Sequence, residues 1–195
     1  MPEPELLSAL MVATAYLLGS VPSAILVCHC MGIADPRQQG SRNPGASNVL
    51  RIGNRKAAFF TLIGDIGKGW CAVSLPQWID LENNVANWCA LAVLLGHLFP
   101  IFARFNGGKG VATAVGICLA LSIPLGIIQM VLWGMLISIG RIASLASIGC
   151  ALISPLAAWL VQPNLMMPVL LISLLLLYTH RDNIRRLVNG AESRF

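Results

Sequence analysis

Two glycine-rich segments carry the residues in this chain that are best suited to bind an anion. Residues 40–51 read GSRNPGASNVLR, and residues 104–110 read RFNGGKG. A backbone rich in glycine and asparagine can turn several N–H groups toward one point, and arginine or lysine side chains add positive charge and further donors. Both segments can therefore cradle a phosphate group, although a polar turn between two membrane helices would explain the first segment equally well.

The candidate residues of these segments are those that offer backbone N–H groups, side-chain donors or positive charge. In the first segment they are Gly40, Ser41, Asn43, Gly45, Asn48 and Arg51, and in the second Gly107, Gly108, Lys109 and Gly110. The second segment leads straight into an apolar run at residue 111, so its N–H groups and the helix dipole would favour an anion beside the lysine. It is not a P-loop, because Gly110 stands where that motif needs Ser or Thr for magnesium.

Polar residues at the ends of apolar runs, or inside them, form the next set of candidates. His97 lies near the end of the third run, and His180 and Asn183 stand at the end of the last one. A single histidine at a membrane boundary is usually an interfacial anchor, so these two matter only if they share a membrane face with the anion-binding segments. Asp65 and Lys68 stand three positions apart inside an apolar run, and they are predicted to form an ion pair that steadies a neighbouring loop.

The composition predicts an integral membrane protein. Of the 195 residues, 56% are hydrophobic and only 11% are charged, and the mean hydropathy is +0.75. Soluble domains carry about 25% charged residues. The net charge of +5 would suggest nucleic acid as the partner of a soluble protein, but these basic residues lie in short loops between apolar runs, so we expect the lipid bilayer and no nucleic acid. No segment is long enough for a second domain, and residues 1–195 are predicted to form one membrane domain.

Seven apolar runs predict an all-α fold with about seven transmembrane helices. The runs cover residues 6–32, 57–79, 85–103, 111–123, 125–140, 143–162 and 165–180. Residues 111–140 form either one long, kinked span or two short spans that fold back at residues 122–126. Two short spans are thin for a hydrocarbon core of about 30 Å, so they require shielding by the protein or a locally thin membrane.

The charges in the loops favour seven spans. Basic residues in the loops of membrane proteins lie mainly on the cytoplasmic side. With a break at Pro124, this rule places every basic residue except Lys68 in the cytoplasm, together with the C-terminus. It places the N-terminus outside, with Glu3, Glu5, Asp80 and Glu82. A model with five spans and further interfacial segments satisfies the same rule. In either case the candidate polar loops share the cytoplasmic face, and we expect them to form one site there.

Four ordered motifs connect the chain to a known family. GSRNPGASNVLR, GDIGKG, GHLFPIFARFNGGKGVAT and HRDNIRRL resemble, in this order, the motifs of the bacterial acyl-phosphate:glycerol-3-phosphate acyltransferases, the PlsY family. The resemblance covers nearly the whole chain. It implies transfer of a fatty acyl group from acyl phosphate to the 1-hydroxyl of sn-glycerol 3-phosphate, which gives lysophosphatidic acid and inorganic phosphate. It also implies a multi-pass protein of the bacterial cytoplasmic (inner) membrane whose site faces the cytoplasm.

The resemblance also assigns roles to individual residues. Ser41 and Arg51 match essential residues of the family's first loop, residues 107–110 match its glycerol-phosphate loop, and the last motif supplies its histidine and asparagine. The expected catalytic residues are Ser41, Arg51, Lys109, His180 and Asn183. The expected substrate-binding residues are Gly40, Asn43, Gly45, Asn48, His97, Gly107, Gly108 and Gly110.

The implied mechanism needs few reactive side chains, because an acyl phosphate is already activated and the protein must mainly hold two anions together. None of the three histidines is followed five positions later by aspartate, so a His–Asp base of that form is missing. We predict that a substrate phosphate oxygen accepts the hydroxyl proton, with His180 as the alternative base.

We expect a monomer without metal or cofactor. The alternatives are a small-anion transporter, whose site would lie near the membrane midplane, and a structural membrane subunit.

Overall fold

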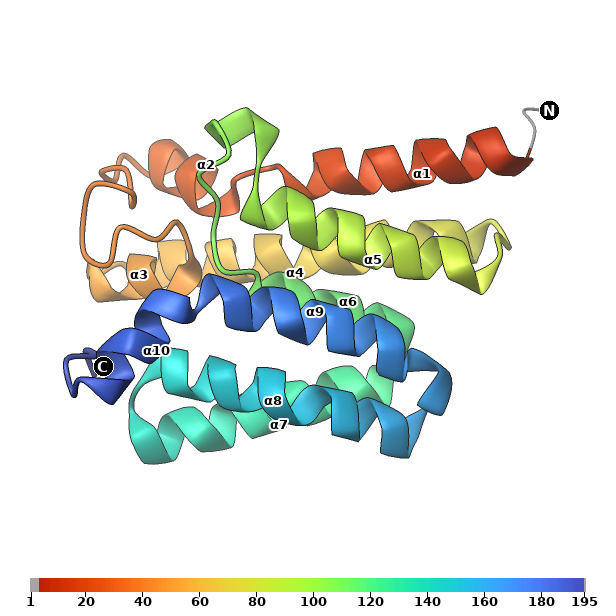
Figure 1. The fold of residues 1–195 in the computed structure, drawn as a ribbon. Helices are drawn as coiled ribbons and strands as arrows, with labels where there is room; N and C mark the ends of the chain where they lie inside the picture. The colour runs from red at the N-terminus through yellow and green to blue at the C-terminus, as the bar shows by residue number, and fades with distance from the viewer. Residues whose placement is uncertain (1–3, 195) are drawn as a thin grey trace.

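The computed structural model describes residues 4–194, and within this range the regular secondary structure is entirely helical (Figure 1). Glu3, which was expected on the outer face, lies outside the described residues. In chain order the helices are α1 (Pro4–Gly19), α2 (Ser23–Cys30), α3 (Ala46–Arg51), α4 (Arg55–Trp78), α5 (Asn83–Leu98), the 3₁₀ turn η1 (Ile101–Ala103), α6 (Val111–Leu121), α7 (Ile123–Gly140), α8 (Ala143–Val161), the 3₁₀ turn η2 (Pro163–Leu165), α9 (Met166–Thr179) and α10 (Arg181–Val188).

The long helices lie side by side, and the two ends of the bundle differ in charge. α2, α3, α10 and the turn between α7 and α8 lie at one end, on the left of Figure 1, whereas the start of α1 and the turn between α4 and α5 lie at the other. The first end, which we call the basic end, carries Arg51, Arg141 and Arg186, and the second carries Asp80 and Glu82. Basic and acidic loops are therefore at opposite ends, as the predicted topology requires. Which end faces the cytoplasm stays a prediction.

Within residues 4–194, three helical segments are long and apolar enough to cross a membrane: α5 with the turn after it, α7 and α8. The pairs α1–α2 and α9–α10 bend by 46° and 59°, and they raise the number to five if each pair is one span. α6 has 11 residues and is therefore about 16 Å long, roughly half of a hydrocarbon core. The seven apolar runs thus all form helices, but seven crossings remain a prediction.

The ambiguous run at residues 111–140 forms two helices. α6 ends at Leu121 and α7 begins at Ile123, with Ser122 in an extended conformation between them. Pro124 stands in the first turn of α7, where its missing N–H removes no helical hydrogen bond. The chain therefore folds back within the segment predicted from the sequence.

Glycines allow two pairs of helices to approach closely. A side-chain carbon at Gly69 of α4 would lie 2.4 Å from the Thr113 carbonyl oxygen of α6, and one at Gly116 of α6 would lie 2.0 Å from the Ile66 carbonyl oxygen of α4. α1 and α5 meet through a similar pair of glycines. Membrane helices pack closely where small residues face each other. This packing holds the short α6 against α4, and it thereby fixes where residues 104–110 enter the bundle.

A buried polar cluster links α4, α5 and α6. The Lys68 ammonium lies 3.0 Å from the Asp65 carboxylate and donates a hydrogen bond to the Val21 carbonyl oxygen between α1 and α2. His97 Nδ1 lies 3.0 Å from the Thr113 hydroxyl oxygen and 3.6 Å from the Asp65 carboxylate. The predicted ion pair is therefore confirmed, and it holds the α1–α2 break, where the missing helical hydrogen bonds leave a carbonyl group in need of a donor.

Adding one methyl group at Gly69 is expected to destabilise the protein, because the methyl would press into the backbone of α6. Gly67→Ala is the matched control, since a side-chain carbon there meets no atom within 4 Å. We expect Gly69→Ala to lower the free energy of unfolding by about 1–3 kcal/mol, and Gly67→Ala to leave it unchanged or raise it by up to about 1 kcal/mol. Thermal unfolding of both variants in detergent measures the difference. Equal midpoints would contradict the close packing of α4 on α6.

Candidate functional site

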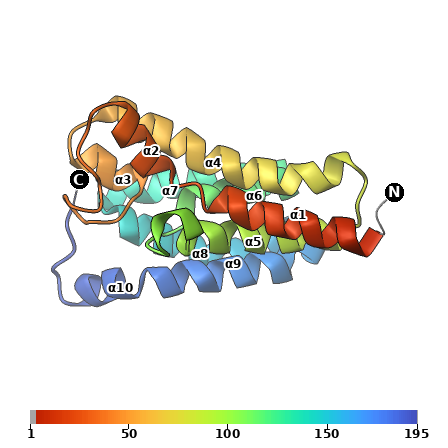
Figure 2. The same cartoon turned by 90° about the horizontal axis from the view of Figure 1, so that it is seen from above.

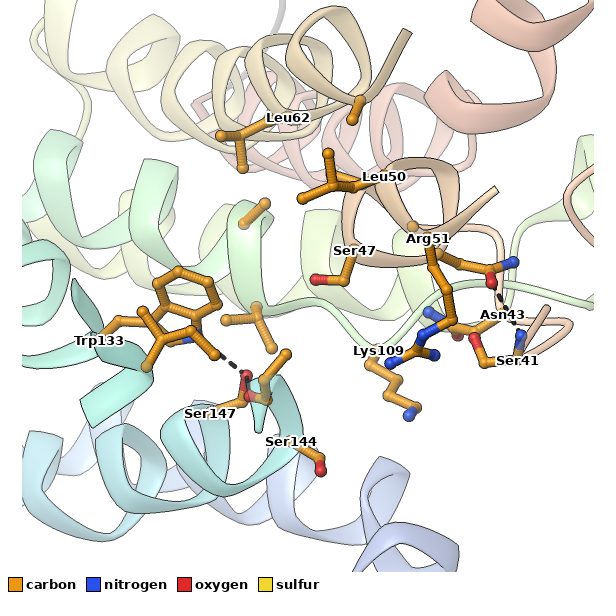
Figure 3. Close-up of a pocket in the computed structure, with 18 of the residues that line it drawn as sticks. Ser41, Asn43, Ser47, Leu50, Arg51, Leu62, Lys109, Trp133, Ser144 and Ser147 are labelled. Atoms are coloured by element: carbon orange, nitrogen blue, oxygen red, sulfur yellow. Dashed lines mark hydrogen bonds between the residues drawn. The ribbon is translucent and has the colours of Figure 1, made fainter. Parts of the chain in front are cut away.

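A cavity of about 1100 Å³ opens at the basic end of the bundle (Figure 3). Its walls come from α3 and the loop before it, from α4 to α8, and from α10 and the segment after it. Ser41, Asn43, Arg51 and Lys109 gather on one side in Figure 3, and Trp133 lies on the opposite side. The cavity therefore has a polar part and an apolar part.

Most of the predicted site residues line this cavity. They are Gly40, Ser41, Asn43, Gly45, Asn48, Arg51, His97, Lys109, Gly110, His180 and Asn183. Gly107 and Gly108 are not among its lining residues. These two glycines and His97 border a separate void of about 10 Å³ beside the α1–α2 break.

The Asn48 side chain holds the loop before α3 by hydrogen bonds to its backbone. Its amide oxygen accepts a hydrogen bond from the Ser41 N–H at 2.8 Å, and its amide nitrogen donates to the carbonyl oxygens of Pro36 and Gln39 at 2.8 and 3.0 Å. The residue is 1% exposed, and a side-chain carbon at Gly40 (φ +58°) would lie 2.3 Å from its amide oxygen. Asn48 and Gly40 were predicted to bind substrate directly. Both residues line the cavity, and the observed contacts of their atoms shape the loop that presents Ser41. Their contact with substrate stays a prediction.

Gly107 and Gly108 pack against the end of α5. A side-chain carbon added at Gly107 would lie 2.2 Å from the His97 carbonyl oxygen. One added at Gly108 would lie 2.3 Å from the His97 ring nitrogen Nε2. The Gly108 N–H donates to the His97 carbonyl oxygen at 3.2 Å, so it is already used within the protein. Gly110 (φ +83°) then turns the chain into α6. Within the predicted glycine-rich cradle, Lys109 and Gly110 are the members that reach the cavity.

A chain of hydrogen bonds joins Lys109 to the segment after α10. The Lys109 ammonium donates to the amide oxygen of Asn183, and the Asn183 amide nitrogen donates to Glu192 Oε1 at 2.6 Å. Glu192 also accepts hydrogen bonds from Ser144 Oγ at 2.7 Å and from Arg186 Nε at 2.6 Å. The start of α6, the start of α8, α10 and the C-terminal segment are thus held together around the polar part of the cavity.

The charge of Lys109 depends on its surroundings. Burial lowers the pKa of its ammonium to about 8; Glu192 and Asp182 raise this pKa, whereas Arg186 and Arg51 lower it. The ammonium is therefore charged at neutral pH but begins to lose its proton in the mildly alkaline range. A bound anion would favour the charged form and raise the pKa again.

His180 is buried and neutral near pH 7. Burial lowers the pKa of its imidazole to about 4, and the charge of Lys109 lowers it further, whereas the contact with Leu176 and the charge of Glu192 raise it. Its Nδ1 lies 2.7 Å from the Leu176 carbonyl oxygen. A carbonyl group can only accept a hydrogen bond, so the neutral ring carries its proton on Nδ1 and leaves Nε2 as an acceptor.

Several residues of the cavity were not in the predicted set. They are the basic residues Arg55, Arg141 and Arg186, the hydroxyl residues Ser47, Ser144 and Ser147, and the acidic residue Glu192. From the sequence alone, basic residues in loops indicate only membrane topology. The sequence therefore could not show that Arg186 lines the cavity while its neighbour Arg185 does not. The only sequence feature that singles out Glu192 is its place as an acidic residue among small and basic residues near the C-terminus. This feature is too weak to predict a site residue.

Apolar side chains of α4 and α7 form the other part of the cavity. They include Phe59, Leu62, Met130 and Trp133. Phe59 and Met130 are 57% and 50% exposed, so this wall continues onto the outer surface of the bundle. The Trp133 indole donates a hydrogen bond to Ser147 Oγ at 3.1 Å, which fixes the ring. An amphipathic molecule with a negative head and an apolar chain fits such a cavity.

The donors in the cavity suit an anion better than a metal ion. Arginine, lysine, asparagine and serine side chains predominate in its polar part. In the described part of the chain, no three His, Cys, Asp or Glu side chains lie close enough to hold a metal ion. Positive charge and N–H donors are the groups that bind phosphate.

The chain matches the family model described as glycerol-3-phosphate acyltransferase over residues 9–190. It is 47% identical over 190 residues to the glycerol-3-phosphate acyltransferase of Methylobacillus flagellatus, covering 96% of this chain and 97% of that one. It is 48% identical over 184 residues to the enzyme of the same name from Burkholderia multivorans, covering 92% and 87%.

Two crystal structures of PlsY, an integral membrane glycerol 3-phosphate acyltransferase, have the same fold. The glycerol 3-phosphate form superposes with a TM-score of 0.91 at 34% sequence identity, and the lysophosphatidic acid form with 0.89 at 32%. Each comparison covers 96% of this chain and 95% of the other. The match of sequence and fold over nearly the full length shows that the chain belongs to the glycerol-3-phosphate acyltransferase family.

Proposed function

We propose that this protein transfers a fatty acyl group from acyl phosphate to the 1-hydroxyl of sn-glycerol 3-phosphate and releases lysophosphatidic acid and inorganic phosphate. The observation that carries this proposal is the cavity that joins a cluster of cations to an apolar wall continuous with the outer surface. The crystal structures of the related PlsY in glycerol 3-phosphate and lysophosphatidic acid forms support the acceptor and the product. The cations suit a phosphorylated acyl donor.

The placement in the membrane follows from the same features. The basic end of the bundle faces the bacterial cytoplasm, because basic loops remain on that side. The seven helical segments cross the membrane, and the short α6 is shielded by α4, against which it packs. All residues of the proposed site come from one chain, so a monomer is sufficient for activity.

The two phosphate groups occupy the polar part of the cavity. Arg51 and Lys109 lie on the same side there, with Ser41 beside them (Figure 3). They offset the repulsion between the two substrates, while His180 and Asn183 orient glycerol 3-phosphate. The fatty chain of the donor extends along the apolar wall of α4 and α7 toward the lipid.

The chemistry follows from this arrangement. The 1-hydroxyl oxygen attacks the acyl carbon, and the bond between that carbon and the phosphate oxygen breaks as the new ester forms. The Arg51 and Lys109 cations stabilise the negative charge that develops on the acyl and phosphate oxygens. The hydroxyl proton passes to a phosphate oxygen of the substrate, so no protein base is needed.

His180 acts by hydrogen bonding in this mechanism. Its Nε2 accepts a hydrogen bond from a hydroxyl of glycerol 3-phosphate, because Nδ1 faces the Leu176 carbonyl oxygen. A base with a pKa of about 4 is weak for an alcohol proton at neutral pH. The substrate phosphate, whose second pKa is near 6, is the better acceptor.

Purified protein is expected to convert palmitoyl phosphate and labelled glycerol 3-phosphate into labelled lysophosphatidic acid with one equivalent of inorganic phosphate. Palmitoyl-CoA should give no product, since its acyl carbon is bonded to sulfur and not to the phosphate that the cations would bind. A chelator should leave the rate unchanged. Absence of product, together with uptake of labelled glycerol 3-phosphate into proteoliposomes, would make the protein a transporter instead.

Removing either central cation should nearly abolish turnover. We expect Arg51→Ala and Lys109→Ala to lower kcat/KM at least about 100-fold while the protein stays folded in detergent. Arg185→Ala is the matched control, since its side chain is 79% exposed and is not part of the cavity lining. Near wild-type activity in either folded cavity variant would refute the assigned roles.

The low pKa of His180 gives a separate test of the proton acceptor. An imidazole with a pKa of about 4 stays neutral above pH 5, so its titration should cause no change in rate between pH 5 and 7. His180→Gln keeps a hydrogen-bonding group, and we expect it to retain kcat within about tenfold of the wild type with an unchanged pH profile. A loss of about 1,000-fold or more would identify His180 as the base.

A further inference from the structure

A carboxylate stands in the polar part of the cavity, where the sequence predicts groups that bind anions. The chain after α10 turns back across the basic end of the bundle (Figure 2), and Glu192 in this segment lines the cavity together with Lys109 and Arg186. Its side chain is only 8% exposed. A largely buried carboxylate is stable where it is paired and hydrogen-bonded, so its contacts indicate what it does.

Both carboxylate oxygens of Glu192 are used. Oε1 accepts from the Asn183 amide at 2.6 Å and from Ser144 Oγ at 2.7 Å, and Oε2 accepts from Arg186 Nε at 2.6 Å. The first contact decides the orientation of the Asn183 side chain. An amide has a donor end and an acceptor end, and a carboxylate can receive only the donor end.

The fixed amide in turn determines where Lys109 points. Because the Asn183 nitrogen faces Glu192, the Asn183 oxygen faces Lys109 and accepts a hydrogen bond from its ammonium. A flipped amide would place its nitrogen beside the ammonium, where two donors would oppose each other. The Lys109 side chain is thus held by a relay that starts at the C-terminal segment.

We propose that Glu192 is a positioning residue that acts through Asn183 to fix the Lys109 ammonium at the reacting phosphate. This role rests on the proposed acyl transfer. Glu192 does not touch the substrates itself. It orders the amide, and the Arg186 guanidinium and Ser144 hydroxyl hold its carboxylate in place.

The first test compares Glu192→Gln and Glu192→Ala with the neighbouring control Arg194→Ala, an exposed residue of the same segment. Glutamine keeps the size of the side chain but presents an amide that can also flip. At pH 6.5, where Lys109 is charged, we expect kcat to fall about tenfold or more in the glutamine variant and further in the alanine variant. Arg194→Ala should match the wild type. Thermal unfolding and size exclusion in detergent should show that the glutamine variant stays folded.

A double-mutant cycle separates positioning from general stability. If Glu192 acts through Asn183, then adding Glu192→Gln to Asn183→Ala should change kcat/KM at pH 6.5 by less than about twofold. Independent, multiplicative losses would overturn the proposal. Wild-type turnover in the same assay reports on the proposed function, so a variant with wild-type kinetics would refute only the role of Glu192.

The pH profile gives a second readout that a purely structural role would not change. Lys109 is faced by Glu192 and Asp182, which raise its pKa, by Arg186 and Arg51, which lower it, and by the neutral His180. Removing the Glu192 charge should move the alkaline fall of kcat/KM to lower pH. An unmoved alkaline limb would overturn the proposal.

A competing role for Glu192 predicts the opposite kinetics. If the carboxylate merely competed with a substrate phosphate for the cations, its removal would relieve that competition. Glu192→Gln would then lower the KM for glycerol 3-phosphate and leave kcat unchanged. That result would also overturn the positioning role.

Discussion

The hydrogen bond from the Lys109 ammonium to the Asn183 amide oxygen joins two positions that are 74 residues apart in the chain. For it to form, α6 must begin beside α9, and α9 must bend by 59° into α10 just before Asn183. The Thr179 hydroxyl supports the same junction by donating to the Lys109 carbonyl oxygen. The positions of the cations in the cavity depend on these connections, because long, flexible side chains keep a defined direction only when a fixed partner holds them.

The lipid environment explains why so many of these groups are paired. A charge in or near a bilayer is costly without a partner. Lys68 is held by Asp65 and by a backbone carbonyl group, and Glu192 is held by three donors. The cations of the cavity gather in its polar part at the basic end of the bundle. The buried polar residues Asp65, Lys68 and His97 connect helices, and Arg51 and Lys109 line the cavity.

The sequence predicted the helical segments, the break near Pro124 and the Asp65–Lys68 ion pair, and most of the site residues that it predicted line the cavity. Each of these has a local signal, such as an apolar run, a proline, a helical spacing or a glycine-rich loop. The separate roles of residues within a loop had no such signal. Asn48 and Gly108 belong to motifs that predict anion binding. In the structure the Asn48 amide forms hydrogen bonds within its own loop, and Gly108 packs against His97. Whether a polar group faces the cavity or the protein depends on neighbours that are distant in the chain.

The sequence by itself therefore determined the class of protein, the order of its helices and the polar loops that line the cavity, because composition and spacing act along the chain. Tertiary structure decided which of the many basic side chains share one cavity and which face solvent. It also decided that Glu192, a residue without a motif of its own, meets Asn183, Ser144 and Arg186. These contacts depend on the bend between α9 and α10, which brings Asn183 and Arg186 near the start of α8. The direction of a packed helix cannot be read from the residues of that helix alone.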